Sequence, residues 1–250
     1  MKVAIVIVNY NGGQEIVRCL QSLQSTVGSE AEIVVVDNAS SDDSVAKIKD
    51  KDLKILKNKK NLGFAAGANI GIKYVLRQGT EAILLLNPDT IVTKNFLRPL
   101  VKNPADIVSP VIKFKRDGSR IYDFGGKINW WLGRTSHIAN FSEDIDYISG
   151  CAMLIKRPVL EKIGFFDERF FLYFEDVDFC LRAKKAGLKI SVEPKSVIFH
   201  QLSGTAKRPW HQNLQLLKSN FLFINRYLKF WQKPIAYIYW LLLAVKILLT

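Results

Sequence analysis

The chain contains the sequence Ala82-Ile83-Leu84-Leu85-Leu86-Asn87-Pro88-Asp89-Thr90, in which an apolar run leads directly into a polar turn. An unbroken apolar run of this length is typical of a strand that is buried on both faces of a parallel sheet. Pro88 cannot donate a backbone hydrogen bond and biases Asn87 toward an extended conformation, so we expect the strand to end there. Asp89 would then lie just past the carboxyl end of a central strand, where open α/β sheets bind their ligands.

Two roles are open for Asp89 from these residues alone. A carboxylate that follows an amide side chain by two residues suits a hard divalent cation that carries substrate phosphates. Alternatively, Asp89 caps a helix that starts near Thr93.

Strands and helices alternate along the chain before this run. The predicted elements, in order, are a strand at 2–9, a helix at 14–26, a strand at 31–37, a short helix opening at Asp42, a strand at 53–56 and a helix at 64–77. Repeated β-then-α units of this kind predict an α/β fold with a doubly wound, mostly parallel sheet and helices on both faces. The polar loops that leave the strand ends would gather on one rim of that sheet.

The pattern becomes less regular after residue 100. The predicted elements are strands at 107–114, 120–124 and 148–155, a helix from Pro158 to Gly164, a helix at 175–186, and short strands at 189–192 and 196–199, with an irregular segment at 125–144. A densely aromatic run, residues 165–174, leads into the helix at 175–186. We find neither an internal repeat nor a low-complexity linker.

The composition fits one large α/β domain or two small ones, because 250 residues with 48% hydrophobic content can bury a sizeable core. The net charge is +13, and residues 194–250 contain eight Lys or Arg residues but no Asp or Glu. A basic tail can attract nucleic acid, anionic lipid or polyphosphate. No nucleic-acid-binding signature accompanies it, so we expect no nucleic acid partner. The three scattered cysteines predict neither a disulfide framework nor a zinc site.

The C-terminal tail has a helical and aromatic pattern from Leu214 onward. Residues 234–250 carry a single charge, on Lys246, but are only 17 residues long, at the lower edge of a membrane-spanning length. Aromatic residues beside Lys and Arg indicate a helix that lies at a membrane interface. The alternative is a core helix or a dimer helix.

Asp37 and the segment 61–71 are candidate nucleotide-binding positions. Asp37 ends a buried strand, and its carboxylate could accept a hydrogen bond from the N3–H of uracil or thymine, or could simply belong to a turn. The segment 61–71 offers backbone N–H groups at a helix start, which suits a phosphate, although its glycines could equally serve helix–sheet packing. It lacks the dinucleotide and P-loop patterns.

Glu175, Asp176 and His200 are the remaining candidates. The two acids begin a helix, where they could stabilise the helix dipole. The aromatic residues before them could instead exclude water and raise a carboxylate pKa toward that of a general base. His200 follows the last predicted strand and is either structural or a metal ligand.

Together these motifs resemble the family 2 glycosyltransferases of the GT-A fold, especially the rhamnosyltransferase-like bacterial branch. The resemblance covers about residues 2–205, in order. The matching pieces are Val8-Asn9-Tyr10-Asn11, Val35-Val36-Asp37-Asn38-Ala39-Ser40, Asn61-Leu62-Gly63-Phe64 with Asn69, Leu86-Asn87-Pro88-Asp89, Ser149-Gly150-Cys151-Ala152 followed by Arg157, Phe174-Glu175-Asp176-Val177-Asp178 and the turn at His200.

The resemblance implies a division of the chain. Residues 1–205 would form the GT-A domain, with a nucleotide-binding half at 1–100 and an acceptor and catalytic half at 101–205. Residues 206–250 would form a basic, aromatic, membrane-associated helical tail.

The resemblance also implies roles for individual residues. Asp89 and His200 would bind Mg²⁺ or Mn²⁺, with Asn87 in place of the first acid of the family's DxD motif. Asp176 would be the catalytic base, and Glu175 and Gly150 would bind the acceptor. The nucleotide sugar would be bound by Asn9, Tyr10, Asp37, Asn61, Asn69 and Asn87.

The implied activity is inverting, metal-dependent transfer of a sugar, with rhamnose favoured by the branch, from a dTDP- or UDP-sugar. The acceptor would be a hydroxyl of a glycan or lipid-linked glycan in cell-surface polysaccharide synthesis. One direct displacement needs one catalytic carboxylate, unlike glycoside hydrolysis. We expect a cytoplasmic protein, peripheral on the inner face of the cell membrane.

Two alternative functions are weighed against this one. A sugar nucleotidyltransferase would need a basic glycine-rich loop after the first strand, and residues 9–13 contain no Lys or Arg. A non-catalytic, glycosyltransferase-like membrane scaffold would not need the expected polar positions to be filled.

Overall fold

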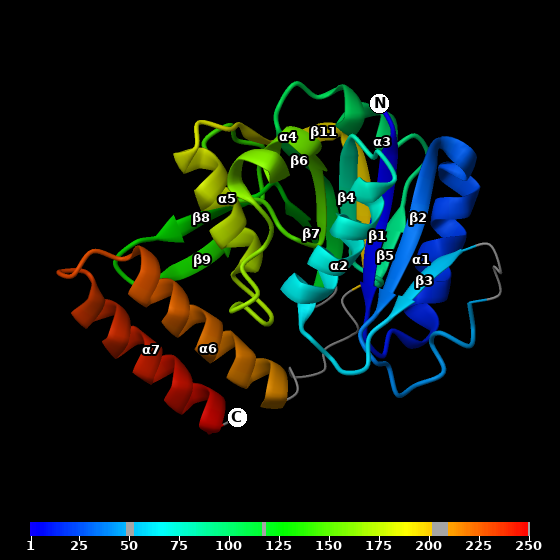
Figure 1. Ribbon diagram of the computed structural model, residues 1–250. Helices are drawn as coiled ribbons and strands as arrows, with labels where there is room; N and C mark the ends of the chain where they lie inside the picture. Colours follow the sequence, from blue (N-terminus) through cyan, green and yellow to red (C-terminus); the bar gives the residue numbers. More distant parts are fainter. Residues whose placement is uncertain (49–52, 117–118, 202–209, 250) are drawn as a thin grey trace.

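Four parallel strands form the first half of the central sheet in the computed structural model, in the order β3-β2-β1-β4 (Figure 1). Their bounds are β1 Val3–Asn9, β2 Ala31–Asp37, β3 Lys54–Lys57 and β4 Ala82–Leu86. Every residue of β1 and β4 is buried, as expected of central strands covered on both faces. The structure describes residues 1–48, 53–116, 119–201 and 210–249.

The second half of the sheet is mixed. The strand β10 (Ala152–Lys156) runs antiparallel to β4 and to β6 (Ile107–Arg116). The strand β11 (Ile190–His200) runs parallel to β6 and antiparallel to β5 (Thr90–Val92), and β7 (Ser119–Asp123) pairs antiparallel with β6. The prediction of a mostly parallel sheet therefore holds for the first half only, because an apolar run indicates burial but not strand direction.

Helices cover both faces of the sheet, as predicted. One face carries α1 (Gly13–Thr26) and α3 (Leu97–Lys102), and a short 3-10 turn, η1 (Gly28–Glu30), follows α1. The other face carries α2 (Phe64–Arg77), α4 (Arg157–Ile163) and α5 (Glu175–Lys185). Each face has its own buried apolar cluster, so the domain is a three-layer α/β structure.

Two predictions of short helices were wrong, one because the segment forms turns and one because the helix begins later. The segment at Asp42 forms turns, because its carboxylate accepts hydrogen bonds from the backbone N–H groups of Gly13 at 2.9 Å and Ser44 at 3.1 Å instead of capping a helix. The helix expected near Thr93 begins only at Leu97, after the short strand β5. Side-chain hydrogen bonding to the local backbone competes with helix formation at such positions.

Three strand predictions also differ from the structure. The segment expected to be irregular contains a hairpin of β8 (Gly126–Asn129) and β9 (Arg134–His137). The two short strands expected after residue 188 form the single strand β11, with an irregular register between Glu193 and Val197. The strand expected from residue 148 starts only at Ala152.

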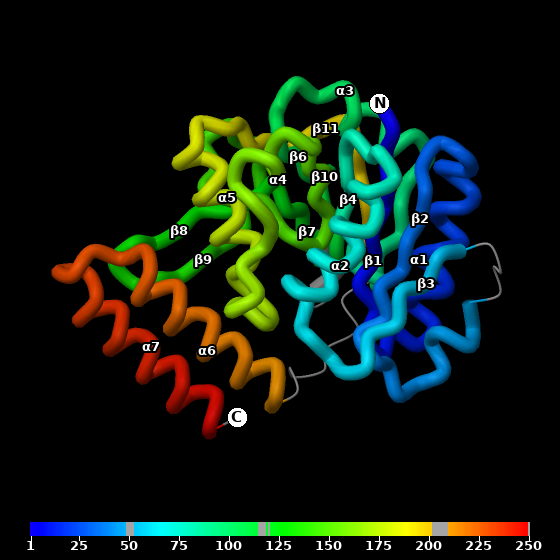
Figure 2. The backbone as a smooth tube through the Cα atoms, viewed as in Figure 1, coloured from blue at the N-terminus to red at the C-terminus, as the bar shows by residue number. Residues whose placement is uncertain are grey.

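Two helices form a hairpin at the C-terminal end, α6 (Trp210–Tyr227) and α7 (Lys233–Leu248), beside the β8–β9 hairpin (Figure 2). The rings of Phe223 and Trp130 lie 6.2 Å apart, and the Asn220 side chain donates to the Gly133 carbonyl at 2.7 Å. The predicted boundary between domain and tail, at 205/206, lies outside the described residues. Within the described ranges, no helix has the length and apolar character needed to cross a bilayer.

A buried ionic cluster joins α6 to α5. Asp178 is fully buried and pairs with Arg182 at 2.8 Å on its own helix. From α6, the Tyr227 hydroxyl donates to Asp178 at 2.5 Å, and Arg226 lies 3.2 Å from the same carboxylate oxygen. The tail hairpin is thus attached to the helix that carries Asp176.

Candidate active site

The pairing of two strand ends holds Asp89 and His200 side by side. β11 runs antiparallel to β5, which sets His200 opposite Thr90, and the Gln201 N–H donates to the Asp89 carbonyl at 2.8 Å. His200 Nε2 lies 3.0 Å from Asp89 Oδ2. Burial lowers the pKa of His200, but its contacts with Cys151 and with the Asp89 carboxylate raise it above its usual value, so a cation bound to the imidazole would replace its proton.

The Asp89–His200 pair fits a divalent cation. Asp89 Oδ1 is buried and has no hydrogen-bond partner in the described structure, which is costly unless a ligand meets it. Carboxylate oxygens are common ligands of Mg²⁺ and Mn²⁺, and a neutral histidine imidazole is the side chain that most often binds metals. The described residues contain no cluster of three or more His, Cys, Asp or Glu side chains that could hold a metal. A cation here would therefore take its other ligands from water and substrate phosphates.

Asn87 is fixed through its backbone. Its N–H donates to the Cys151 carbonyl at 2.8 Å, and its carbonyl accepts from the Thr90 hydroxyl at 2.7 Å. The Asn87 side chain is half-buried and makes no hydrogen bond to another described residue. The side-chain amide therefore remains available to a ligand beside Asp89.

Asp176 is held at the first turn of α5 by two backbone N–H groups. Gly150 donates to its Oδ2 and Val177 to its Oδ1, both at 2.8 Å. Burial raises the pKa of Asp176 above its usual range, while these two hydrogen bonds oppose the rise. A carboxylate with fixed geometry and a raised pKa is suited to accept a proton.

Glu175 precedes Asp176 and is 6% exposed, with a buried Oε2 that lacks a partner in the described part of the chain. Burial and the adjacent Asp176 charge raise the pKa of Glu175 well above its usual range. The two residues before it, Tyr173 and Phe174, have φ angles of +69° and +67°. Left-handed backbone at bulky residues costs about 1–3 kcal/mol each and is concentrated at functional sites.

The ends of β1 and β2 form a polar pocket around Asp37. The register sets Asn9 opposite Asp37, and Asn9 Nδ2 lies 3.2 Å from Asp37 Oδ1 and 3.1 Å from the Ser40 hydroxyl. Ser40 also donates to Asp37 Oδ1 at 2.6 Å, which leaves Oδ2 without a hydrogen bond to another described residue. Tyr10, the next residue after β1, is 46% exposed. A Cβ at Gly12 would lie 2.3 Å from Asn9 Oδ1, so a larger residue there would displace the Asn9 side chain.

Gly150 and Cys151 join the Asp89–His200 pair to Asp176. Gly150 holds the Asp176 carboxylate, and the Cys151 side chain contacts His200. The predicted metal ligands and the predicted base therefore lie on either side of a two-residue segment.

Residues 4–164 match the Glycosyl transferase family 2 domain, which is more than half of the chain. The chain belongs to glycosyl transferase family 2. This match confirms the family predicted from the motifs and places the chain among sugar-transferring enzymes.

Two curated relatives of this family 2 chain differ in how much of their length it spans. The low-salt glycan biosynthesis hexosyltransferase Agl10 of Haloferax volcanii is 31% identical over 198 residues, which cover 75% of the chain and 63% of the relative. The N-acetylglucosaminyl-diphospho-decaprenol L-rhamnosyltransferase of Mycobacterium tuberculosis is 24% identical over 268 residues, covering 93% of the chain and 87% of the relative. The chain thus spans less than two thirds of Agl10.

A solved structure of GalNAc-T7 with UDP, GalNAc and Mn2+ shares the fold, with a TM-score of 0.68 and 17% identity. The superposition covers 87% of this chain and 47% of that protein. The predicted α/β fold class is therefore confirmed.

Two asparagines predicted to bind the nucleotide sugar have structural contacts in this family 2 chain. The Asn61 side chain accepts from the Gly63 N–H at 2.9 Å, within the loop before α2. Asn69 is 2% exposed and bonds both the N–H and the carbonyl of Phe166, at 3.0 and 2.9 Å. Its amide also reaches Glu168 at 2.9 Å. These contacts count against a ligand role for Asn69, which instead anchors the aromatic segment before α5.

The motifs gave no indication of Asp123 and His137, which the structure places near Asp176. Asp123 ends β7, which matches the strand expected at 120–124, but no motif singled it out. His137 ends β9, in the segment expected to be irregular because its short strands lack an alternating apolar pattern. Only the long-range pairing of β6 with β7 brings Asp123 toward the site.

Proposed function

We propose that the chain is an inverting, metal-dependent glycosyltransferase that moves a sugar from a nucleoside-diphosphate sugar to a hydroxyl of a glycan or lipid-linked glycan acceptor. The observation that carries the proposal is the Asp89–His200 pair, in which Asp89 Oδ1 is buried without a described partner. The segment Gly150-Cys151 lies between this pair and Asp176. Sugar transfer from a diphosphate needs these two functions together, because the leaving diphosphate must be neutralised and the acceptor must lose a proton.

The nucleotide binds at the ends of β1 and β2 in this proposal. Asp37 Oδ2 accepts a hydrogen bond from the N3–H of uracil or thymine, while Asn9 and Ser40 hold the other oxygen of the carboxylate. The exposed Tyr10 ring offers an apolar surface beside the base. Asn61 and Asn87 lie in the loops that would face the diphosphate and the sugar.

Asp89 and His200 would hold the cation, Mg²⁺ or Mn²⁺, and the cation would supply the charge that neutralises the departing diphosphate. Asn87 would contribute a neutral side chain where the family's DxD motif has an acid. The loss of one negative charge is expected to weaken the affinity for the free cation, so the diphosphate of the donor would supply more of the binding.

Asp176 removes the proton from the acceptor hydroxyl as the oxygen attacks the anomeric carbon. The bond from this carbon to the diphosphate oxygen breaks, and the new glycosidic bond forms on the opposite face, which inverts the anomeric configuration. Gly150 and Val177 fix the Asp176 carboxylate during the step. Glu175 lies beside the acceptor, where its unpartnered oxygen can bind an acceptor hydroxyl.

The donor that we propose is dTDP-rhamnose, and the acceptor a lipid-linked glycan in cell-surface polysaccharide synthesis. Support comes from the mycobacterial relative, which is named as an L-rhamnosyltransferase and matches 93% of this chain. Asp37 itself does not separate dTDP from UDP, because thymine and uracil present the same N3–H.

We place the protein in the cytoplasm, peripheral on the inner face of the cell membrane. The α7 helix supports this proposal, because apolar side chains such as Ile238 and Leu242 are 61% and 64% exposed on its outer side. Lys229, Lys233 and Lys246 flank these side chains without any acidic residue nearby in sequence. An apolar stripe with flanking basic residues is typical of helices at an anionic membrane surface.

The test is a transfer assay with a panel of dTDP- and UDP-sugars, with Mg²⁺, Mn²⁺ or EDTA, and N-acetylglucosaminyl diphosphate linked to a short prenyl chain as acceptor. We expect transfer from one donor class, loss of transfer with EDTA, and a donor-induced rise in melting temperature that needs the cation. The product should have the inverted anomeric configuration. Full activity in EDTA would remove the metal role, and the absence of transfer and of donor hydrolysis with every sugar would refute the enzymatic proposal.

A further inference from the structure

A buried carboxylate and a histidine form a pair that the proposed chemistry does not use. Asp123, at the end of β7, is 4% exposed. Its Oδ2 lies 2.8 Å from His137 Nδ1, and its Oδ1 accepts from the Gly125 N–H at 2.8 Å. The His137 side chain is 51% exposed, so the histidine of this pair is accessible to a ligand while the aspartate is buried.

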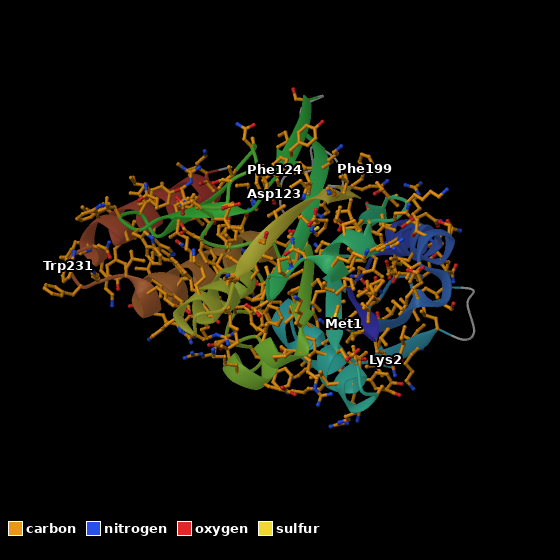
Figure 3. All side chains as sticks on the ribbon, turned by 90° about the horizontal axis from the view of Figure 1, so that it is seen from above. Met1, Lys2, Asp123, Phe124, Phe199 and Trp231 are labelled. Carbon is orange, nitrogen blue, oxygen red and sulfur yellow. The ribbon has the colours of Figure 1, made fainter. Side chains whose placement is uncertain are left out.

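Strand pairing places Asp123 close to the Asp89–His200 pair. Ile198 on β11 stands opposite Ile112 on β6, which in turn stands opposite Asp123 on β7. Neighbouring strands lie about 4.8 Å apart, so the backbones of Ile198 and Asp123 are separated by roughly 10 Å. Side chains alternate between the faces of a sheet, so His200, two residues after Ile198, shares a face with Asp123. Figure 3 shows Asp123 and Phe199 near the same edge of the sheet.

His137 also lies within electrostatic range of Asp176. Burial lowers the pKa of His137, but the hydrogen bond and the charge of Asp123, together with the charge of Asp176, raise it above its usual value. The positive charge of His137 in turn acts to lower the pKa of Asp176. The chain also connects the two side chains, because Tyr147, whose ring packs against His137, lies three residues before Gly150, whose N–H donates to Asp176.

The orientation of the His137 ring is fixed on two sides. Asp123 accepts from Nδ1, and the buried Tyr147 ring packs against the imidazole edge-on, with 5.9 Å between ring centroids. Because Nδ1 is committed, the other nitrogen, Nε2, is the donor left for a ligand, and no described residue accepts from it. A donor held in this way by a buried carboxylate is preorganised for binding.

This pair lies on the acceptor side of the sheet. Asp123 ends a strand that pairs with β6 in the mixed half of the sheet, whereas the ends of β1 and β2, where the nucleotide would bind, belong to the parallel half. The β8–β9 hairpin that carries His137 packs on α6, the first helix of the tail hairpin, through Trp130 and Gly133. A lipid-linked acceptor that approaches from α7 would therefore meet this hairpin before it reaches Asp176.

We propose that His137 is an acceptor-binding residue, whose Nε2–H donates a hydrogen bond to an oxygen of the carbohydrate acceptor beside the hydroxyl that Asp176 deprotonates. In this role Asp123 is a positioning residue that acts through His137. The inference rests on the proposed function, because it assigns the acceptor subsite of that reaction.

The experiment compares two substitutions at His137 that differ in which ring nitrogen they replace. In His137→Asn the amide nitrogen stands near the position of Nδ1, so the Asp123 contact is kept while the Nε2 donor is lost. In His137→Gln the longer side chain carries its amide nitrogen near the position of Nε2. His211→Asn, at an exposed histidine of α6, is the matched control. Each variant is assayed for transfer, for donor hydrolysis without acceptor, and for melting temperature.

We expect the acceptor KM to rise about tenfold or more in His137→Asn, the effect of losing one hydrogen bond from a charged donor. The donor KM and the rate of donor hydrolysis should stay within about twofold of the wild type, and His137→Gln should recover part of the acceptor affinity. An unchanged acceptor KM, or an equal loss of transfer and hydrolysis in both variants, would overturn the inference. If His137→Asn does not fold, the same readouts on His137→Gln decide. A wild type without transfer or hydrolysis refutes the proposed function itself, and the subsite with it.

Discussion

The donor rim and the acceptor rim of the sheet differ in how their polar groups are satisfied. At the donor rim, the ends of β1, β2 and β3, the backbone N–H of Asn38 donates to the Asn9 carbonyl, and Asn58 bonds Asp37 and Asn38. At the acceptor rim, the ends of β5, β7 and β11 with the start of α5, Asp89 and Glu175 each keep a buried oxygen without a described partner. Most polar groups that end the strands of the donor rim are paired within the fold, whereas the acceptor rim keeps two buried carboxylate oxygens that a ligand could pair.

One atom on the donor rim is also buried without a described partner, Asn9 Oδ1. That atom stands beside the Asp37 pocket, where a nucleotide would lie. The unsatisfied atoms of both rims thus coincide with the places where the proposed substrates bind, which is where natural proteins tolerate such costs.

Removing the proposed base should have the largest effect. Asp176→Asn is expected to lower kcat by a factor of about 10²–10⁴, the usual contribution of a general base. The donor Kd should stay the same, because the nucleotide binds at the donor rim. Steady-state kinetics and donor titration by calorimetry measure the two quantities. Asp144→Asn, which removes an exposed partner of Lys127, is the control, and a kcat of Asp176→Asn within threefold of this control would contradict the role.

The donor rim is also the part of the chain that could be predicted from its sequence. The elements before residue 90 follow each other locally as parallel β-then-α units, and α2 begins and ends where its apolar spacing and glycines predict. Asn9 and Asp37 lie opposite each other because the strands they end are neighbours in register. The local apolar pattern and the order of the strands were therefore sufficient to predict the donor rim.

The acceptor rim could be predicted only in part. The position of Asp176 at the start of α5 followed from the motif, but its contact with Gly150 depends on segments 26 residues apart. The Asp123–His137 pair depends on the pairings of β6 with β7 and of β8 with β9. The sequence has no apolar alternation that predicts these pairings. Neighbouring strands also become antiparallel in this half of the sheet, and a pattern of buried residues does not indicate strand direction.

The second largest effect is expected on stability, at the buried ionic cluster that attaches the tail to the acceptor half. Asp178→Asn removes the buried charge that faces Arg182 and Arg226, and we expect a loss of about 3 kcal/mol, as for other broken buried ion pairs. Asp43→Asn, which breaks the exposed pair with Lys47, should cost less than about 0.5 kcal/mol. Urea unfolding measures both. Equal effects would show that the cluster does not stabilise the junction.

A smaller effect is expected where the two halves meet at Gly63. This residue has φ of +84°, and a Cβ there would lie 2.3 Å from the Phe171 carbonyl oxygen, which accepts from the Phe64 N–H. Gly79 has a similar φ of +78° but open space around its Cα, so it separates backbone strain from the clash. We expect Gly79→Ala to cost about 1 kcal/mol and Gly63→Ala about 2 kcal/mol or more. Thermal unfolding with equal losses for both would remove the clash as a cause.

The smallest expected effect is at Glu175. It tests whether a buried carboxylate oxygen without a hydrogen-bond partner lowers the free energy of unfolding. Burial and the Asp176 charge raise the pKa of Glu175 in the folded chain above its ordinary value of 4.5, so the folded state holds this proton more tightly than the unfolded state. Stability from this group is fully present below the unfolded pKa and is lost as the pH rises through the folded pKa.

Glu175→Gln should therefore stabilise the fold by roughly 1 kcal/mol at pH 8 and leave it unchanged near pH 4, while it weakens acceptor binding. Urea midpoints at the two pH values measure the difference, and Glu143→Gln, at an exposed position, is the control. A Glu175→Gln variant that is less stable than the wild type at pH 8 would mean that the carboxylate is satisfied within the fold. In that case its unpartnered oxygen would no longer distinguish the acceptor rim from the donor rim.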